Sequence, residues 1–376
     1  MAITILYLVS SLADCGPVNV LWGIVRYLDR QKYRPVIATL SQEPSESSIQ
    51  RFRANGIEIR PMNLSRPESL LLGRKKVRTL IAETGAGILH CHGIRATLLG
   101  AGTTSECRVI ATLHCDLDQD YRSAYGRLPG AVMRNLEYPA LKKCTAVIAV
   151  SDNVSEAARN HGVHAAVIRN GIDLEKYCPP RNPAETAEIR RRLEWPIESI
   201  IILHTGVLID RKRPIEIIEG FLSAYVPERC TLVLAGDGPL KSRCIQAANH
   251  SKQIIFLGRR GDVADLLKAA DVLVSNSESE GFPLALLEGC ASGIQVLASD
   301  IPAHRKLQEL FPEQCKLFEE GDKQSLAAAL SSISGSRRMQ LSPIEEGLSA
   351  ISDRTMAEAY GTIYQRLLKG DSTDAT

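Results

Sequence analysis

The sequence predicts an α/β protein with two parallel, doubly wound sheets, each covered by helices on both faces. Three observations predict this class. The chain has 376 residues, which suits two domains. Short apolar runs alternate with longer amphipathic stretches along its length. The short runs are rich in Val, Ile and Leu and show little alternation, as is typical of strands buried on both faces in βαβ units.

Residues 1–170 form the first predicted unit, in which strands and helices follow one another in turn. Strands are expected at Ile3–Val9, Pro35–Leu40, Gly87–His90, Arg108–Leu113, Ala146–Val150 and Ala165–Ile168. Helices are expected at Val18–Asp29, Glu68–Glu83, Ile94–Thr104, Arg122–Lys143 and Asp152–His161.

Residues 171–350 form the second predicted unit and repeat the pattern. Strands are expected at Ile200–Thr205, Thr231–Ala235, Ile254–Leu257, Val272–Ser275 and Val296–Ala298. Helices are expected at Ile215–Ala224, Leu240–Asn249, Val263–Ala270, Pro283–Ala291 and Lys323–Ile333. The proline-rich segment 177–184 is interpreted as the hinge between the units. A last amphipathic helix is expected at Asp353–Lys369, and its apolar face has to dock on another element.

The overall charge hides an asymmetry between the two halves. The formal net charge is +2, which argues against a nucleic-acid-binding protein. Residues 1–170 carry 21 Lys and Arg against 14 Asp and Glu, whereas residues 171–376 carry 24 against 29. An anionic membrane surface is therefore a candidate partner for the basic half, and a solvated surface without a partner is the alternative.

Cysteine usage and hydropathy predict the compartment. The ten cysteines form no C-x-x-C pair, so their spacing indicates neither a zinc site nor a thioredoxin motif. The first residues lack the positive start of a secretory signal, and no uncharged apolar run is long enough to span a bilayer. We therefore expect a reduced, cytoplasmic protein, with peripheral binding at the inner face of the membrane as a further expectation.

The segment around Glu280 and Glu288 carries the strongest functional signal. A buried strand is expected to end near Ser275, a polar loop follows, and Pro283 suits the first position of a helix. Such a helix start presents unpaired N–H groups and a positive dipole end, which together bind phosphate. Glu288 lies more than a turn inside the helix, where it can accept hydrogen bonds from sugar hydroxyls. The alternative is a plain strand–loop–helix with one surface glutamate.

A series of motifs accompanies this segment along the chain. The two glutamates stand in E-G-F-P-L-A-L-L-E, residues 280–288. The others are His90-Cys-His-Gly93, Thr112-Leu-His114, Ala149-Val-Ser151, Arg169-Asn-Gly-Ile-Asp173, Ala235-Gly-Asp-Gly-Pro-Leu240, Phe256-Leu-Gly258, Ala270-Asp-Val-Leu-Val-Ser275, Ala291-Ser-Gly293 and Val296-Leu-Ala-Ser-Asp300. In this order they resemble the motifs of the family-four (group 1) retaining glycosyltransferases. The likeness implies the GT-B fold: two Rossmann-like domains that face each other across a cleft, with the C-terminal helix crossing back onto the first.

The resemblance implies a role for each unit. Residues 1–170 with helix 353–369 would bind the acceptor, and residues 171–350 would bind a nucleotide-sugar. The implied reaction moves a sugar from a nucleotide-diphosphate sugar to a glycan or lipid-linked acceptor with retention of configuration. It implies no metal and no further cofactor, and the usual setting is cell-envelope or capsular polysaccharide synthesis.

The resemblance also assigns the two glutamates and the backbone around them. The resemblance places Glu280 near the donor sugar and its phosphate, and it places Glu288 in contact with the ribose hydroxyls. The backbone N–H groups of Phe282 and Leu284 would face the phosphates. The other implied nucleotide contacts are Gly281, Pro283, Leu257, Gly258 and Arg259.

The diphosphate also needs cations, and the stretch after Gly206 supplies them. Lys212 matches a lysine of the family, whereas Val207 stands where the family has an arginine. Two arrangements remain open. Either Arg211 supplies the second cation, or the diphosphate relies on Lys212 and the helix at Pro283.

In the first unit, His114 matches a family histidine close to the reaction centre. Its ring N–H would orient the transferred sugar or stabilise charge, and a structural hydrogen bond is the alternative. His90 and His92 are further candidates. Gly16 belongs to a loop that approaches the diphosphate in the family, although Pro17 removes one donor there.

Other polar and basic segments favour structural readings. Asp116, Asp118 and Asp120 resemble the metal-binding D-x-D of another glycosyltransferase fold, and we interpret them as an acidic surface loop without a metal. Asp173 is expected to be structural or to line the cleft. The basic stretch 70–78, which begins with three leucines, could touch anionic lipid or be a solvated helix.

Three rival functions remain. A nucleotide-sugar epimerase shares the architecture but needs a pair of acid/base side chains that we do not identify. A dinucleotide oxidoreductase needs G-x-G-x-x-G after the first strand, and residues 10–16 hold a single glycine. A binding-only homologue is kept open by Val207 and Pro17.

Overall fold

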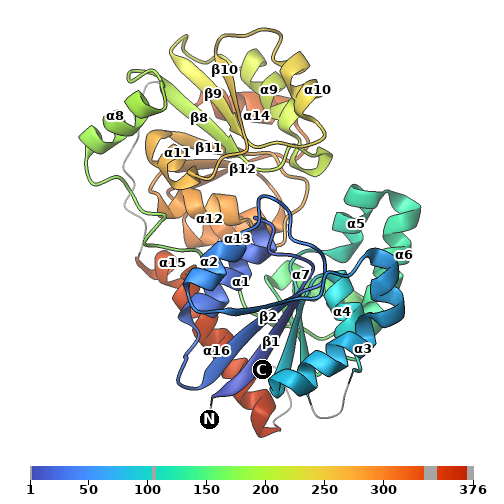
Figure 1. Cartoon of the computed structure of the whole chain (residues 1–376). Helices are drawn as coiled ribbons and strands as arrows, with labels where there is room; N and C mark the ends of the chain where they lie inside the picture. Colours follow the sequence, from blue (N-terminus) through green and yellow to red (C-terminus); the bar gives the residue numbers. More distant parts are fainter. Residues whose placement is uncertain (1, 104–106, 334–344, 371–376) are drawn as a thin grey trace. The chain divides into compact units, whose positions relative to one another are not determined.

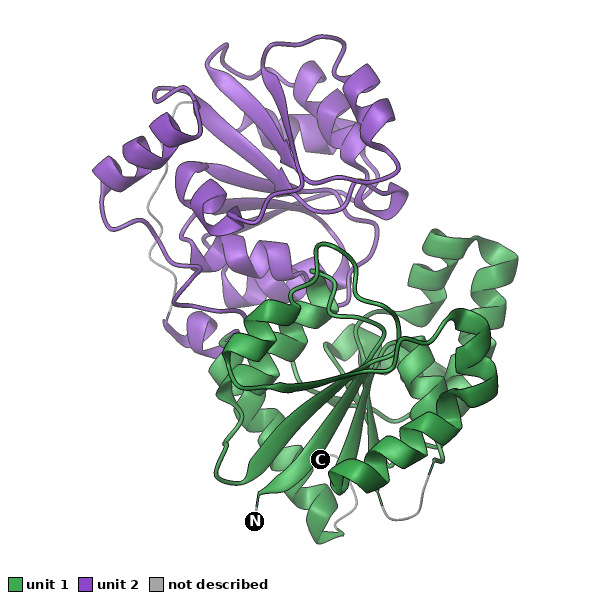
Figure 2. Ribbon diagram, viewed as in Figure 1, with its two compact units in different colours: residues 1–171, 352–376 green, residues 172–351 purple. Residues whose placement is uncertain are grey.

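The computed structural model describes residues 2–103, 107–333 and 345–370 (Figure 1). The chain divides into two compact units, coloured separately in Figure 2. Unit 1 comprises residues 1–171 and 352–376, and unit 2 comprises residues 172–351. The proline-rich segment 177–184, expected to be the hinge, lies inside unit 2, since the division falls between Gly171 and Ile172.

Unit 1 is built on a seven-stranded parallel sheet with the order β3-β2-β1-β4-β5-β6-β7. The strands are β1 (Ile3–Val9), β2 (Tyr33–Thr39), β3 (Glu58–Pro61), β4 (Ala86–His92), β5 (Arg108–Leu113), β6 (Ala146–Ala149) and β7 (Ala166–Val167). β1 and β4 are buried almost throughout, which explains their continuous apolar sequences.

Helices cover this sheet on both faces (Figure 1). They are α1 (Gly16–Tyr27), α2 (Ile49–Ala54), α3 (Arg66–Thr84), α4 (Ile94–Gly100), α5 (Leu117–Tyr125), α6 (Arg127–Leu141), α7 (Asp152–Asn160) and α16 (Asp353–Lys369). α1 packs against α16, and α4 packs against α3 and α6. The single helix expected at 122–143 is wrong: Gly126, at a φ of 84° that glycine tolerates, separates α5 from α6. Thr104, the last residue of the helix expected at 94–104, lies outside the described residues.

The C-terminal helix α16 returns to unit 1 and docks on its sheet through buried tyrosines. The Tyr364 hydroxyl lies 2.8 Å from Nδ1 of His90 and 3.1 Å from the Tyr7 hydroxyl. The Tyr360 hydroxyl lies 3.1 Å from Oγ1 of Thr112. These contacts join the last helix to β1, β4 and β5, so the predicted crossing of the C-terminal helix is confirmed.

Unit 2 has a six-stranded parallel sheet with the order β10-β9-β8-β11-β12-β13. The strands are β8 (Ile200–Thr205), β9 (Cys230–Ala235), β10 (Ile254–Gly258), β11 (Val272–Ser275), β12 (Gln295–Ser299) and β13 (Cys315–Phe318). The helices are α8 (Pro183–Arg192), α9 (Pro214–Ser223), α10 (Lys241–Ala247), α11 (Val263–Ala269), α12 (Leu284–Ala291), α13 (Pro302–Leu310), α14 (Lys323–Ser331) and α15 (Glu345–Ala350). The predicted fold class, two parallel Rossmann-like sheets with helices, is confirmed.

A buried ion pair fixes the central strands of unit 2. Arg190, on α8, lies 2.7 Å from Oδ2 of Asp271, and the same oxygen accepts the backbone N–H of Ile201 at 2.7 Å. Both charged side chains are buried. Because Asp271 precedes β11 and Ile201 lies in β8, this pair sets the start of the two strands that carry the candidate site at their other ends.

Candidate active site

The candidate site of unit 2 lies where the order of its sheet reverses. β8 and β11 are neighbours, and the connections from them run in opposite directions across the sheet. In open parallel sheets, ligands bind beyond the carboxyl ends of the strands at such a switch point. The loop after β8 carries Arg211 and Lys212, and the loop after β11 carries Glu280. The adjacency of two strands therefore brings together residues that are distant in the chain.

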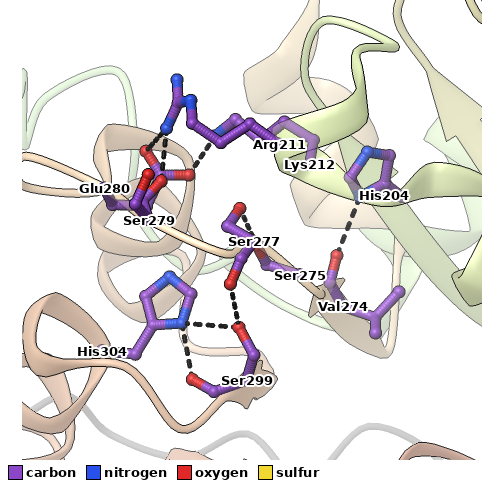
Figure 3. A network of polar contacts seen from close by, with 10 residues as sticks. All are labelled: His204, Arg211, Lys212, Val274, Ser275, Ser277, Ser279, Glu280, Ser299 and His304. Carbon is purple, nitrogen blue, oxygen red and sulfur yellow. Dashed lines mark hydrogen bonds and ion pairs between the residues drawn. The ribbon is translucent and has the colours of Figure 1, made fainter. Parts of the chain in front are cut away.

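Glu280 is held by both cations (Figure 3). Arg211 Nη1 lies 3.2 Å from Oε2 of Glu280, and Nζ of Lys212 donates to Oε1. Arg211 also donates to the carbonyl of Ser279, and its own carbonyl accepts the N–H of Glu278 at 2.8 Å. The side chain of Glu280 is only 9% exposed. The two loops therefore form one charged unit around a buried carboxylate.

Electrostatics keep Glu280 ionised. Burial by itself raises the pKa of a carboxyl, but the nearby charges of Lys212 and Arg211 outweigh it and lower the pKa of Glu280 to about 2. At neutral pH this side chain is therefore an anion and a hydrogen-bond acceptor, not a proton donor.

The start of α12 borders the same place. The helix begins at Leu284, with Pro283 as its N-cap, so it starts one residue later than predicted. The N–H groups of a first helical turn have no partner within the helix, which favours an anion there. A small cavity is lined by Lys212, Glu280 and Pro283 together. The predicted phosphate-binding elements thus meet around one space within unit 2.

Two buried histidines in this site were missed by sequence reasoning. Nδ1 of His204, in β8, lies 3.1 Å from the carbonyl of Val274, and Nδ1 of His304, in α13, lies 2.8 Å from the carbonyl of Ser299 (Figure 3). Ser299 in turn donates to the carbonyl of Ser277 at 2.6 Å. Burial is the main cause that lowers the pKa of each histidine to about 4. The neutral ring of His204 therefore contacts β11, and that of His304 supports, through Ser299, the loop that leads to Glu280.

Glycines bring the turn after β9 against the loop after β8. Gly206 follows β8 with a φ of 151°, and a Cβ added to Gly236 would lie 1.8 Å from the carbonyl oxygen of Gly206. The N–H of Leu208 also donates to the carbonyl of Asp237 at 3.0 Å. The turn at Asp237 thus supports the loop that carries Arg211. The exposed Val207, in this loop, takes no part in the Glu280 cluster.

The other predicted nucleotide contacts lie at separate places in unit 2. Leu257 and Gly258 end β10, which β9 separates from β8, and Arg259 follows them. Gly281 and Phe282 are buried beside Glu280, whereas Glu288 is half-buried, more than a turn into α12. These residues lie at or beyond the carboxyl ends of the strands, where the sequence predicts a nucleotide site. Their contacts with a ligand remain a prediction.

The predicted residues of unit 1 also follow strands. His114 comes directly after β5 and is partly exposed, and its Nε2 lies 3.0 Å from Nδ1 of His92 at the end of β4. Gly16 is the first residue of α1, so Pro17 stands in a first turn, where its missing N–H costs no helical bond. His90 is buried under α16 and serves the docking of that helix.

The acidic segment after His114, expected to be a surface loop, is instead the N-terminal part of α5, with Asp118 and Asp120 in its first turn, and its side chains have structural partners. Asp116 caps α5 by accepting the N–H of Asp118 at 2.9 Å, and Asp118 pairs with Arg134 at 2.6 Å and with His161 at 2.7 Å. Asp173 accepts the N–H of Glu175 at 3.1 Å in a turn. In the described part of the chain, no group of three or more His, Cys, Asp or Glu side chains is arranged to hold a metal ion.

Each unit has a doubly wound parallel sheet of the Rossmann type, and two such units in one chain are the architecture of the GT-B proteins. Residues 16–176 match the family model described as Glycosyltransferase Family 4, and residues 185–348 match that described as Glycosyl transferases group 1. The chain belongs to this family of glycosyltransferases.

Known proteins show the same likeness. The chain is 29% identical over 227 residues to UDP-Gal:alpha-D-GlcNAc-diphosphoundecaprenol alpha-1,3-galactosyltransferase of Escherichia coli, an alignment that covers 57% of this chain and 58% of that enzyme. An O-antigen biosynthesis glycosyltransferase of Escherichia coli is 24% identical over 97% of this chain and 99% of its own length. The crystal structure of an Anabaena protein in complex with UDP and glucose superposes with a TM-score of 0.79, at 19% identity, over 96% of this chain and 99% of that one. This last similarity concerns the fold.

Proposed function

We propose that the protein is a retaining glycosyltransferase that moves a sugar from a nucleotide-diphosphate sugar to a glycan or lipid-linked acceptor in cell-envelope polysaccharide synthesis. The observation that carries the proposal is the contact of Lys212 and Arg211 with Glu280 beside the start of α12. The relatives named for galactosyl transfer and O-antigen synthesis support the reaction class and its setting.

Unit 2 is the proposed donor site. A diphosphate that enters the space beside Lys212 would meet two cations and the first N–H groups of α12, which together suit a doubly charged anion. Glu288 would hold the ribose hydroxyls, and the base would rest near Leu257 and Gly258. UDP is the nucleotide we favour, because the relatives with a stated nucleotide bind or use it.

Unit 1 is the proposed acceptor site, with His114 as its reactive side chain. No side chain of the Glu280 cluster is an obvious covalent nucleophile, since Glu280 is engaged by two cations. We therefore favour displacement on the same face of the sugar, in which the departing phosphate is stabilised by Lys212, Arg211 and helix N–H groups where charge develops. The family implies that this occurs without a bound metal.

Peripheral membrane contact through α3 is the second part of the proposal. Leu70 and Leu71 are 85% and 83% exposed, and Leu72 is exposed as well. One turn after each leucine stands an exposed cation, in turn Arg74, Lys75 and Lys76. Residues four apart share a helix face, so each of the three leucines lies on the same face of α3 as one cation. This pattern suits the headgroup region of an anionic bilayer.

A groove extends the same surface. It has a volume of about 660 Å³ and is lined by Leu72, Lys75 and Lys76 of α3 and by Arg60 to Met62 at the end of β3. Among the described residues, no helix has the length and apolar character of a membrane span. The proposed contact is therefore a surface contact, at the inner face of the membrane.

The experiment that tests the proposal is a transfer assay. Purified full-length protein is incubated with UDP-sugars and with lipid-linked acceptors in detergent, and the product is identified by mass spectrometry and by the configuration of its new bond. We expect transfer with retention. Thermal stabilisation by NAD but by no nucleoside diphosphate, or nucleotide binding without transfer to any acceptor, would contradict it.

A further inference from the structure

Three histidine rings lie in a row on one face of the sheet of unit 1, and only one of them is exposed enough to meet a ligand. β4 and β5 are parallel neighbours, and side chains two residues apart share a face. The ring of His92 lies 4.4 Å from that of His90 and 5.2 Å from that of His114, centroid to centroid. His92 is buried, whereas His114 is partly exposed. His92 therefore separates the interior of the unit from the predicted reactive ring.

One hydrogen bond joins the last two rings. It connects Nδ1 of His92 with Nε2 of His114 over 3.0 Å, so a single proton lies between two ring nitrogens. A neutral imidazole carries its proton on either nitrogen, and which one is set by its partners. The question is which ring donates.

The environment of His92 answers it. Its Nε2 is buried and has no hydrogen-bond partner among the described residues. If that nitrogen carried the proton, a buried N–H would be left unpaired, which is rare in proteins. With the proton on Nδ1, the N–H of His92 is used in the bond to His114, and only a lone pair is left unpaired. His92 is therefore the donor and His114 Nε2 the acceptor.

The tautomer of His114 follows from this. Burial is the main cause that lowers the pKa of His114 to about 4 and that of His92 well below its ordinary value, so both rings are neutral at pH 7. A neutral His114 that accepts at Nε2 carries its only proton on Nδ1. No hydrogen bond of that nitrogen is recorded within the described part of the chain, so it is open to a ligand.

We propose that His92 is a positioning residue that holds His114 in its Nδ1–H form, so that His114 presents a hydrogen-bond donor to an oxygen of the transferred sugar. This inference rests on the proposed function for its ligand, but not for the tautomer. A His114 free to exchange tautomers would present a lone pair for part of the time. A lone pair can only accept a hydrogen bond from a sugar hydroxyl, and it stabilises no negative charge that develops on a sugar oxygen.

Nuclear magnetic resonance of the full chain, labelled with ¹⁵N-histidine, tests the tautomer without any activity. His114 is assigned with the variant His114→Gln. We expect the Nδ1–H form in the parent protein, a mixture of tautomers in His92→Phe, and recovery of the Nδ1–H form in His92→Asn, whose amide places an N–H near the position of Nδ1. His90→Asn is the matched control, because His90 lies on the same face but bonds Tyr364 and Thr112 instead. An Nε2–H form in the parent protein, or an unchanged tautomer in His92→Phe, would overturn the assignment.

Kinetics test the consequence. For His92→Phe we expect kcat to fall roughly tenfold, the equivalent of about one hydrogen bond, with the KM for donor changed by no more than about twofold, and His92→Asn to restore it. A loss of stability alone would lower the active fraction in His90→Asn as well and would spare kcat per folded molecule. A protein that transfers no sugar would refute the proposed function while the spectra still decide the tautomer. An unchanged kcat beside the expected spectra would refute the positioning role.

Discussion

Lys212 donates to the carboxylate of Glu280, 68 residues further along the chain. Together with Arg211 it keeps that carboxylate ionised although it is buried. A diphosphate would compete with Glu280 for the same two cations. The cluster of two cations and one carboxylate therefore keeps a formal charge of +1, and the affinity for a diphosphate depends on how strongly Glu280 competes for the two cations.

Replacing Lys212 by Met should weaken binding of nucleoside diphosphate by at least about tenfold, since a charge-assisted contact is lost. It should also destabilise unit 2 by about 2 kcal/mol, because Glu280 then stays buried with one cation. Isothermal titration and urea unfolding measure the two effects. Lys241→Ala is the control: Lys241 pairs with Asp237 at a half-exposed position, so both quantities should stay near those of the parent protein. Equal UDP affinity in both variants would contradict the donor site.

The fold could be predicted from the sequence where strands are buried on both faces. The predicted bounds of Ile3–Val9, Arg108–Leu113, Ile200–Thr205 and Val272–Ser275 agree with the structure, because continuous apolar runs leave no other reading. β3 and β13 were not predicted. Each has four residues at the edge of its sheet and carries charged or half-exposed side chains, so its pattern does not differ from that of a loop.

The candidate site could be predicted only in part, for a related reason. Glu280, Lys212 and the start of α12 follow strands and belong to motifs that the sequence shows. The ion pair between the first two depends on the adjacency of β8 and β11, which no local pattern encodes. His204 was missed because a single histidine in an apolar strand is usually a core residue. His304 was missed because its hydrogen bond to Ser299 depends on the folded structure and not on a local sequence pattern.

Variants of the two glutamates should lose different properties, one turnover and the other nucleotide binding. Glu280→Gln removes the anion that competes for Lys212 and Arg211, so it should bind UDP at least as tightly as the parent protein while kcat falls. Glu288→Ala should weaken UDP binding through loss of the ribose contact. Titration with UDP and steady-state kinetics separate the two. If both variants keep both properties, the assignment of the glutamates is wrong.

The contact between the turn after β9 and the loop after β8 should be sensitive to a single methyl group. Gly236→Ala would place a Cβ against the backbone oxygen of Gly206, so the loop that carries Arg211 has to move. We expect UDP binding to weaken by about tenfold, because the side chains that contact the phosphates shift out of position. Gly261→Ala is the matched control, since nothing lies within 4 Å of its added Cβ. Unchanged affinity in Gly236→Ala would show that this loop does not position the donor.

Binding to vesicles should depend on both halves of the α3 surface. Leu70→Ser with Leu71→Ser removes the apolar contact, and Lys75→Glu with Lys76→Glu removes cations worth about 1 kcal/mol each, so each pair should weaken binding to phosphatidylglycerol vesicles by at least about tenfold. Co-sedimentation measures it. The control is Ile245→Ser, a half-exposed apolar residue on α10 of unit 2. Equal binding of the parent protein to phosphatidylcholine and phosphatidylglycerol vesicles would contradict the electrostatic part.

Stability should fall as the pH drops below about 6.5, and His304 should account for part of the loss. Burial lowers the pKa of His304 from 6.5 to about 4. Between these two values the unfolded chain binds a proton that the folded chain does not, so folding weakens as the pH falls through this window. Glu280 affects stability at lower pH. Its pKa in the folded chain, about 2, lies below the ordinary 4.5, so its contribution to the free energy of unfolding is present above pH 4.5 and disappears toward pH 2.

The variant His304→Asn tests this pH dependence, because the asparagine amide places an N–H near the position of Nδ1 and can keep the bond to the Ser299 carbonyl, but it does not titrate. The parent protein should lose about 3 kcal/mol more than the variant between pH 7 and pH 4, the equivalent of the lowered pKa. Urea unfolding at several pH values measures the difference. The same change at the exposed His164 should leave the slope of the parent protein unaltered. Parallel curves for the parent protein and His304→Asn would mean that the pKa of His304 is the same in the folded and the unfolded chain, so that burial does not keep this ring neutral between pH 4 and pH 6.5.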